Sequence, residues 1–282
     1  MIVGIDLGTT HSLVGAYGET GSRLFRNALG EVLTPSVVSL DESGVLVGQA
    51  ARERLVSHPQ RTVSNFKRWM GSSRETRLGD RNFRPEELSA MVLRSLIADA
   101  EAELGERVTE AVISVPAYFS DAQRKATRTA GELAGIKVER LINEPTAAAL
   151  AYGLQEREGE GRFLVFDLGG GTFDVSILEV FEGVVEVHAS AGDNFLGGED
   201  FLDVLVEAFC ADHTLRPREL PSHELAQVRR RLEQVKRELS QGAQASAQVQ
   251  IDGRTLEWTV DEARFTKLCE PLVQRMRAPL ER

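Results

Sequence analysis

The chain has 282 residues, of which 42% are hydrophobic and 27% charged, and its formal net charge is −10. This composition is typical of a globular protein with about two domains, and the acidic balance argues against nucleic-acid binding, which normally requires a basic face. The two cysteines form no CxxC pair and the five histidines show no metal-ligand spacing, so neither a disulfide framework nor a zinc site is predicted.

The sequence also lacks the signals of a membrane or secreted protein. No apolar run approaches the roughly 20 residues that a membrane-spanning helix needs. The chain begins directly with the strand-like run Ile2–Ile5 rather than with a basic and then apolar leader. We therefore expect a cytoplasmic protein that contacts neither a membrane nor nucleic acid.

The first part of the chain is predicted to consist of short strands joined by turns. A hairpin is expected over 2–17, and short strands are expected within 34–40 and 44–48. A short helix follows over 49–56. The polar, arginine-rich stretch 57–84 is predicted to be loop-like.

Helices and buried strands are predicted to alternate in the middle of the chain. A helix over 85–105 is signalled by a proline and two glutamates in its first turn and a glycine at its end. The apolar run 111–115 is predicted to be a buried strand. Ser120–Gln123 has the pattern of a capping box that opens a helix ending at Gly135, and a further helix is expected over 143–153.

The last part of the chain is predicted to contain strands up to His188, followed by a helix that residues 192–198 introduce. Ser222 is expected to cap a long helix with one apolar face. Asp252-Gly253 predicts a hairpin turn. The final helix contains Pro271 and is expected to be bent or broken there.

The stretch 155–161 is rich in Glu and Gly, and it is the most linker-like part of the chain. The alternation of elements predicts an α/β fold of two lobes divided at this stretch. The expected division is lobe I over 1–158 (core 1–35 and 85–158, outer subdomain 36–84) and lobe II over 159–282 (core 159–196, helical outer subdomain 197–282).

Two matched turns carry most of the functional information. Ile5–Thr10 and Phe166–Thr172 each join an apolar strand, an Asp at its end and a Gly/Thr turn. Glycine lets the backbone approach a phosphate, and successive N–H groups form an anion-binding nest. Two such units suggest two lobes that hold one nucleotide between them.

Asp6 and Asp167 are the candidates for positioning Mg²⁺, because this ion keeps several waters and uses one or two carboxylates plus phosphate oxygens. Asp174 could act on the same ion or hold the turn. The alternative for any one of these carboxylates is an Asx interaction that only caps the turn. Neither GxxxxGK[ST] nor a helix-opening GxGxxG is present, which indicates a different nucleotide-binding architecture.

Four motifs resemble the nucleotide-binding domain of the seventy-kilodalton heat-shock chaperones, the DnaK family, and they occur in that family's order. They are residues 4–10, 112–119, 142–149 and 166–175. The blocks 66–71, 120–125 and 187–194 are most similar to the bacterial HscC branch. The resemblance covers the chain from end to end and implies an actin-like (ribonuclease H-like) ATPase fold around a nucleotide cleft.

The resemblance implies a role for individual residues. Lys67 would reach the γ-phosphate and orient the attacking water, and Glu144 would lie near Mg²⁺ and sense ATP. Pro116 and Arg124 would form a switch that couples nucleotide state to a partner domain. The remaining implied site residues are Gly8, Thr9, Thr10, the backbone of His11, Gly169, Gly170, Gly171 and Thr172 around the phosphates, Gly198 nearby, and Glu233, Lys236, Arg237 and Ser240 around adenosine.

The resemblance also implies cofactors, partners and further chain. The cofactors are ATP or ADP and Mg²⁺, with K⁺ as an additional candidate. The partners are a J-domain co-chaperone, client polypeptides and a nucleotide-exchange factor. After Arg282 the family continues with a Gly-Gly strand over adenosine, the end of lobe I and a peptide-binding domain, so we expect lobe II to be incomplete in this chain.

The expected activity is slow ATP hydrolysis that drives a chaperone cycle, because phosphoryl transfer to water depends mainly on positioning and charge stabilisation. Three alternatives remain open at this point. A small-molecule kinase of the same superfold would need a catalytic Asp and has no reason to carry the Pro116–Arg124 pair. An actin-like filament protein would need polymerising surfaces, and a fragment without turnover would serve only as a folded interaction module.

Overall fold

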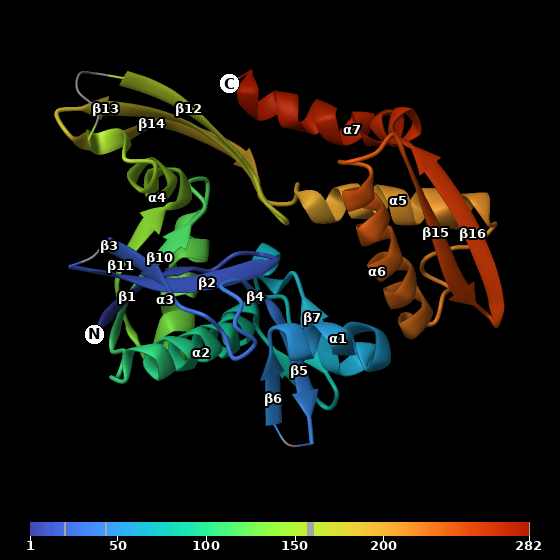
Figure 1. Ribbon diagram of the computed structural model, residues 1–282, viewed down its shortest axis with the longest axis horizontal. Helices are drawn as coiled ribbons and strands as arrows, with labels where there is room; N and C mark the ends of the chain where they lie inside the picture. Colours follow the sequence, from blue (N-terminus) through green and yellow to red (C-terminus); the bar gives the residue numbers. More distant parts are fainter. Residues whose placement is uncertain (20, 43, 157–160, 282) are drawn as a thin grey trace.

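The computed structural model describes residues 1–282 except 20, 43, 157–160 and 282. Figure 1 shows two lobes: one carries the N-terminal half of the chain, and the other the sheet β12–β14 and the long helices α5–α7. The predicted linker 155–161 lies partly outside the described residues. On its two sides the short 3-10 helix η3 (Leu154–Glu156) ends and β12 begins.

A mixed sheet of order β11-β10-β1-β2-β3, with β4 paired to β2, forms the centre of lobe I. Strands β1, β10 and β11 are parallel, whereas β2 runs antiparallel to β1 and confirms the predicted hairpin. The elements are β1 (Ile2–Asp6), β2 (His11–Gly18), β3 (Gly21–Leu24), β4 (Thr34–Pro35), β10 (Glu110–Val115) and β11 (Lys137–Asn143), with α2 (Pro85–Leu104), α3 (Asp121–Ala134) and α4 (Glu144–Ala151).

Helices α2 and α3 of lobe I begin and end where the sequence predicts. Ser120 accepts the N–H of Gln123, and the Gln123 side chain returns to the Ser120 N–H at 2.9 Å, which completes the predicted capping box. Helices α2 and α3 end at Gly105 and Gly135 with φ of 71° and 91°, a left-handed conformation that glycine adopts without a Cβ penalty.

The outer part of lobe I contains more regular structure than expected. The loop predicted over 57–84 is wrong, since this stretch holds three short strands and two 3-10 helices. Each of these strands has three residues, too few to show a periodicity, and β7 forms by pairing with the distant strand β5. The elements are β5 (Val37–Asp41), β6 (Gly44–Val47), α1 (Gln49–Ser57), η1 (Pro59–Arg61), β7 (Thr62–Ser64), η2 (Phe66–Trp69), β8 (Thr76–Leu78) and β9 (Arg81–Phe83).

Lobe II consists of an antiparallel sheet β12-β13-β14, the helices α5–α7 and the hairpin β15–β16. The hairpin turns at Asp252-Gly253, both with positive φ, as the sequence predicts. The elements are β12 (Gly161–Leu168), β13 (Phe173–Phe181), β14 (Val184–Asp193), α5 (Gly198–Asp212), α6 (Ser222–Glu238), β15 (Gln244–Ile251), β16 (Arg254–Asp261) and α7 (Glu262–Leu280).

Two expectations for lobe II helices are corrected. Ser222 does not cap α6: it is the first helical residue, and the cap position belongs to Pro221, whose carbonyl accepts the Leu225 N–H at 3.0 Å. The last helix is not broken at Pro271, because α7 continues to Leu280 with Cys269 and Leu272 buried and Leu272 packed in a lobe II cluster; the alternative expectation, a bend there, stays a prediction. Tertiary packing there outweighs the lost hydrogen bond.

Each lobe has a core of its own. The largest apolar cluster lies in lobe I between its sheet and α2 and α3, and a second one lies in lobe II between α5, α6 and the hairpin β15–β16. Helix α6 of lobe II lies beside α1 of lobe I and contacts it (Figure 1). None of the described helices combines the length and the apolar surface needed to cross a bilayer.

Candidate nucleotide site

The first glycine turn connects β1 to β2 and is held tightly from inside lobe I. The Gly8 N–H donates to Ser12 Oγ at 3.2 Å, and the Gly8 carbonyl accepts from Ser36 Oγ at 2.8 Å. A Cβ on Gly8 would lie 2.0 Å from the His11 carbonyl oxygen. Only glycine therefore fits this position.

The second turn connects β12 to β13 and lies directly against the first. The Gly169 N–H closes it by donating to the Thr172 carbonyl at 3.0 Å. A Cβ on Gly170 would lie 2.2 Å from Thr10 Cγ2, and a Cβ on Gly171 would lie 2.3 Å from Thr9 Cγ2. The structure therefore brings together the two turns that the sequence singled out from opposite lobes.

A buried lysine and a half-buried carboxylate lie beside these turns. Lys67 is 4% exposed, and its Nζ contacts Glu144 Oε1 at 3.1 Å and lies 5.5 Å from the ring centroid of Phe119. Burial raises the pKa of Glu144 to about 7, the positive charge of Lys67 opposes this rise, and Asp6 adds to it. The pair thus sits in a poorly solvated pocket next to further negative charge.

The three predicted metal-binding carboxylates belong to the same charged cluster. Ser114 Oγ donates to Asp6 Oδ1 at 2.6 Å, and the Tyr118 N–H donates to Asp174 Oδ1 at 3.1 Å. Burial raises the pKa of Asp174 to about 6, with a contribution from Asp167. Burial and then Asp6 also raise the pKa of Asp167.

This donor set fits Mg²⁺ chemically, because it consists of oxygen ligands that repel one another until a cation neutralises them. Among the described residues, however, no three His, Cys, Asp or Glu side chains are arranged to hold a metal by themselves. Waters and phosphate oxygens would have to supply most of the coordination, as is usual for Mg²⁺.

The predicted switch residues are in direct contact. The Arg124 guanidinium donates to the carbonyls of Phe119 and Ala117, each at 3.1 Å, and to that of Pro116 at 3.5 Å. It also donates to Asn143 Oδ1 at 2.8 Å, next to Glu144. One side chain on α3 therefore fixes both the turn after β10 and the start of α4.

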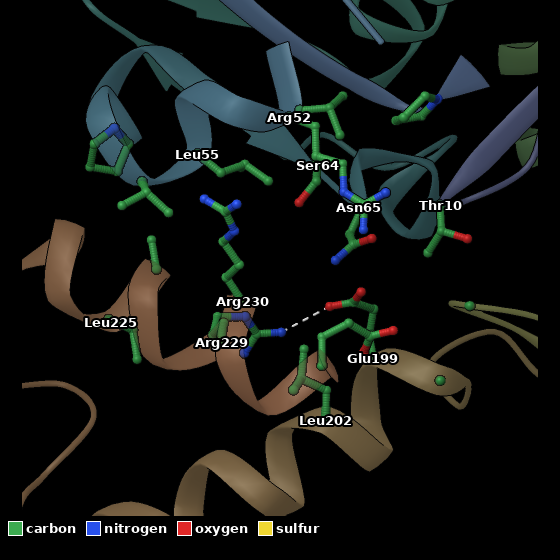
Figure 2. Close-up of a pocket in the computed structure, with 18 of the residues that line it drawn as sticks. Thr10, Arg52, Leu55, Ser64, Asn65, Glu199, Leu202, Leu225, Arg229 and Arg230 are labelled. Carbon is green, nitrogen blue, oxygen red and sulfur yellow. Dashed lines mark hydrogen bonds and ion pairs between the residues drawn. The ribbon is translucent and has the colours of Figure 1, made fainter. Parts of the chain in front are cut away.

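A cavity of about 1140 Å³ opens from the glycine turns between α1 and α6. Figure 2 shows its two walls, with Arg52 and Leu55 on the lobe I side and Glu199, Leu202 and Arg230 on the lobe II side. The predicted nucleotide-binding residues that line it are Thr10, His11, Gly170, Gly198, Glu233, Lys236 and Arg237.

Within this cavity, the α6 residues form a connected group. Lys236 Nζ donates to the Gly198 carbonyl at 2.9 Å and pairs with Glu233 at 2.7 Å, while Arg237 Nε donates to Glu233 at 3.0 Å. Ser240 does not line the cavity, because α6 ends at Glu238 and Ser240 lies exposed in the turn that follows. Burial, followed by the charges of Arg52 and Arg237, lowers the pKa of His11.

Two groups of functional interest were missed from the sequence. Ser114, which holds Asp6, could have been noticed as a polar residue inside the apolar strand 111–115. Arg68 directly follows Lys67 and pairs with Asp200, 132 positions away in the sequence. No local pattern could have indicated this pair.

The sheets, the paired turns and the cleft between the lobes define a two-lobed nucleotide-binding fold. The sequence model of the Hsp70 family, described as "Hsp70 protein", matches residues 2–78 and 73–282. The curated proteins named "Chaperone protein DnaK" from Thermotoga petrophila and Thermotoga maritima are each 45% identical to the chain over 99% of its length, and that from Thermotoga neapolitana is 44% identical over the same share.

The chain belongs to the Hsp70 family, and its fold is the actin-like ATPase fold of that family. It covers 49% of the length of these three relatives, and so spans about half of each. The expected family membership and fold class are confirmed. The resemblance to the HscC branch stays a prediction, since all three of these relatives bear the name DnaK.

Proposed function

We propose that the chain binds MgATP between its two glycine turns and hydrolyses it slowly, as the nucleotide-binding part of an Hsp70-type chaperone. The observation that carries this proposal is that two glycine turns, one from each lobe, meet beside the pair formed by the buried Lys67 and the half-buried Glu144. Backbone N–H groups and a lysine can hold a polyphosphate, while the carboxylates suit its metal ion.

Each group of residues has its own task in this proposal. The N–H groups of the two turns bind and orient the β- and γ-phosphates, and Glu233, Lys236 and Arg237 line the place of the nucleoside. Lys67 donates hydrogen bonds from Nζ to the γ-phosphate and to the attacking water. Thr172, in the second turn, lies around the phosphates. Bound Mg²⁺, held through water by Asp6, Asp167 and Asp174, would screen the phosphate charge, and K⁺ could share these oxygens.

The lobe boundaries predicted from the sequence are part of the same proposal, as is a bacterial-type cytoplasmic location.

Pro116 and Arg124 would transmit nucleotide state to a partner domain, because Arg124 links the turn after β10 to the start of α4. A J-domain co-chaperone, a nucleotide-exchange factor and client polypeptides would be the partners. The similarity of 187–194 to the HscC branch supports placing the chain near that branch.

Calorimetric titration of the 282-residue chain with MgATP tests the proposal. We expect one site, and we expect Gly170→Ala to abolish or strongly weaken binding, since its Cβ would meet Thr10 Cγ2 at 2.2 Å. Gly18→Ala is the matched control, because no atom of the described residues lies within 4 Å of a Cβ there. Absence of heat with the unaltered chain would contradict the proposal, and heat without phosphate release would reduce it to binding alone.

A further inference from the structure

Three consecutive side chains of the short helix η2 have three different partners. Lys67 contacts Glu144 in the core of lobe I, whereas Arg68 and Trp69 reach across the cleft to Asp200 and Phe195 of lobe II. The helix follows Asn65, whose φ of 61° places it in the left-handed region and turns the chain sharply. The four residues of η2 are therefore attached to both lobes at once.

The pair formed by Arg68 and Asp200 is bidentate and poorly exposed. One guanidinium nitrogen donates to Asp200 Oδ1 at 3.3 Å and the other to Oδ2, and the two side chains are 12% and 17% exposed. Asp200 is fixed in turn, because its Oδ2 accepts the Gly197 N–H at 2.8 Å at the start of α5. A bidentate Arg–carboxylate pair of this kind has a defined geometry that a lysine cannot reproduce.

Arg68 also lies against the second glycine turn. Its Nε is buried and has no hydrogen-bond partner among the described residues, and a Cβ on Gly171 would lie 2.9 Å from it. The guanidinium is thus enclosed between Asp200 and the turn that we propose to bind phosphate. Any movement of this turn relative to lobe I must displace Arg68.

An aromatic contact lies next to this ion pair. The rings of Trp69 and Phe195 are 5.0 Å apart at 55°, and the Arg74 guanidinium lies 4.0 Å from the Trp69 ring centroid. The Phe195 N–H donates to Asp193 Oδ1 at 2.8 Å, and Asp193 pairs with Arg275 of α7 at 2.6 Å. Asp193 therefore links the Phe195 backbone to α7 of lobe II.

We propose that Arg68 and Trp69, with Asp200 and Phe195, form an interlobe clasp that positions Lys67. The role of Lys67 in turnover rests on the proposed function above, whereas the clasp itself does not require a nucleotide. Because the clasp residues adjoin Lys67 within one helical turn, separation of the lobes pulls η2 away from Glu144. The lysine is then correctly placed only while the lobes are closed.

The first test uses the nucleotide-free chain and measures how fast an amine-reactive acylating reagent labels Lys67, by peptide mass spectrometry. Asp200→Asn and Phe195→Ala should each raise this rate roughly tenfold, since they make local opening more frequent. Asp203→Asn on the same helix, which pairs with Arg229 inside lobe II, and Phe181→Ala, with a similar exposure of 47%, are the matched controls. Unchanged labelling of Lys67 would overturn the clasp.

The second test measures turnover in the same variants. Asp200→Asn and Phe195→Ala should lower kcat roughly 10- to 100-fold, as expected when a catalytic group is displaced, while the Kd for MgATP changes by no more than about threefold. Arg68→Lys should also lower kcat, because a lysine cannot form the bidentate pair with Asp200. A merely structural role would leave the kcat of the folded protein unchanged, and that outcome would refute positioning.

The two tests separate the clasp from the proposed function. If the unaltered chain fails to bind MgATP, the proposed function fails, and the labelling of Lys67 still decides whether the clasp holds that side chain. If MgATP binds and turns over but the labelling rates of variants and controls agree, the proposed function stands and the clasp is wrong.

Discussion

Lys67 is a lysine whose ammonium is almost entirely removed from water, and such a position normally lowers stability unless the charge is paired. We expect Lys67→Ala to bind MgATP with similar affinity but to lose turnover, because the phosphate would still meet the N–H groups of both turns. Lys125→Ala, at an exposed position on α3, should leave both properties intact. Isothermal titration and single-turnover phosphate release make the comparison, and normal turnover in the Lys67 variant would remove this residue from the mechanism.

Asp174 gives a prediction for pH at the same scale. Its pKa rises from 3.8 to about 6 on folding because of burial, so between these values the folded chain binds more protons than the unfolded chain. Its contribution to stability is therefore most favourable below the unfolded pKa and declines as the pH rises toward 6.

Asp174→Asn removes this titration but keeps an oxygen for the Tyr118 N–H. The free energy of unfolding of the variant is compared with that of the unaltered chain, in the absence of Mg²⁺ and nucleotide. We expect this difference to shift in favour of the variant by roughly 1–3 kcal/mol when the pH is raised from 4 to 7. Urea denaturation at the two pH values measures the difference. An equal difference at both values would show that the carboxyl group is not perturbed in the folded chain.

The site residues that sequence analysis found without the family resemblance lie in the two glycine turns, which are short local patterns. Asp6 and Gly8, like Asp167 and Gly170, are only two or three positions apart, so the turn chemistry is visible in the sequence itself. The pairing of Arg68 with Asp200 is not visible, because it depends on how two lobes meet. Ser240 was predicted wrongly: the family resemblance implied that it lies with Arg237 at the nucleoside, but α6 ends at Glu238 and Ser240 lies in the turn that follows.

At the scale of elements, helices were easier to predict than short strands. The capping box of α3 and the glycines after α2 and α3 are local signals, and the structure has each of them where expected. The strands β7, β8 and β9 have three residues each and depend on pairing partners rather than on their own pattern. Helix α7 continues through Pro271 because its packing against lobe II is also non-local.

Arg124 provides a prediction at this scale because it connects three elements. Arg124→Ala would remove this donor from the carbonyls of Ala117 and Phe119, while the Pro116 carbonyl would keep the Phe119 N–H, and it should lower the free energy of unfolding by about 1–3 kcal/mol. Hydrogen exchange should increase at the start of α4, near Asn143, as well as in the turn after β10.

Lys125→Ala is the control, since this neighbour on α3 is exposed. Exchange that increases only around residues 116–119, with the start of α4 unaffected, would show that Arg124 supports the turn but does not couple it to α4. Denaturant titration provides the free energies for both variants.

At the scale of the whole molecule, the separate cores of the two lobes predict unfolding in more than one step. Leu232 is fully buried in the lobe II core, and Leu232→Ala should destabilise that lobe by roughly 2–5 kcal/mol. The lobe I transition should change little, because the two clusters share no residue. Differential scanning calorimetry distinguishes this from a single cooperative unit, in which both transitions would shift together.

A ligand that contacts both lobes should stabilise both. MgATP at 100 times its Kd is expected to add about 2.7 kcal/mol to the stability of the state that binds it. We expect the two calorimetric transitions to move closer together in its presence. A shift of only one transition would mean that the nucleotide binds to a single lobe.

The close packing of the two glycine turns has a kinetic consequence. Gly170 and Gly171 lie directly against Thr10 and Thr9, so the two turns are in contact. If the phosphate chain binds between these turns, as proposed, they must first separate to admit it. Association would then be limited by the rate of this opening, well below the encounter rate. Dissociation would require the same opening, so that a nucleotide once enclosed would have a long residence time.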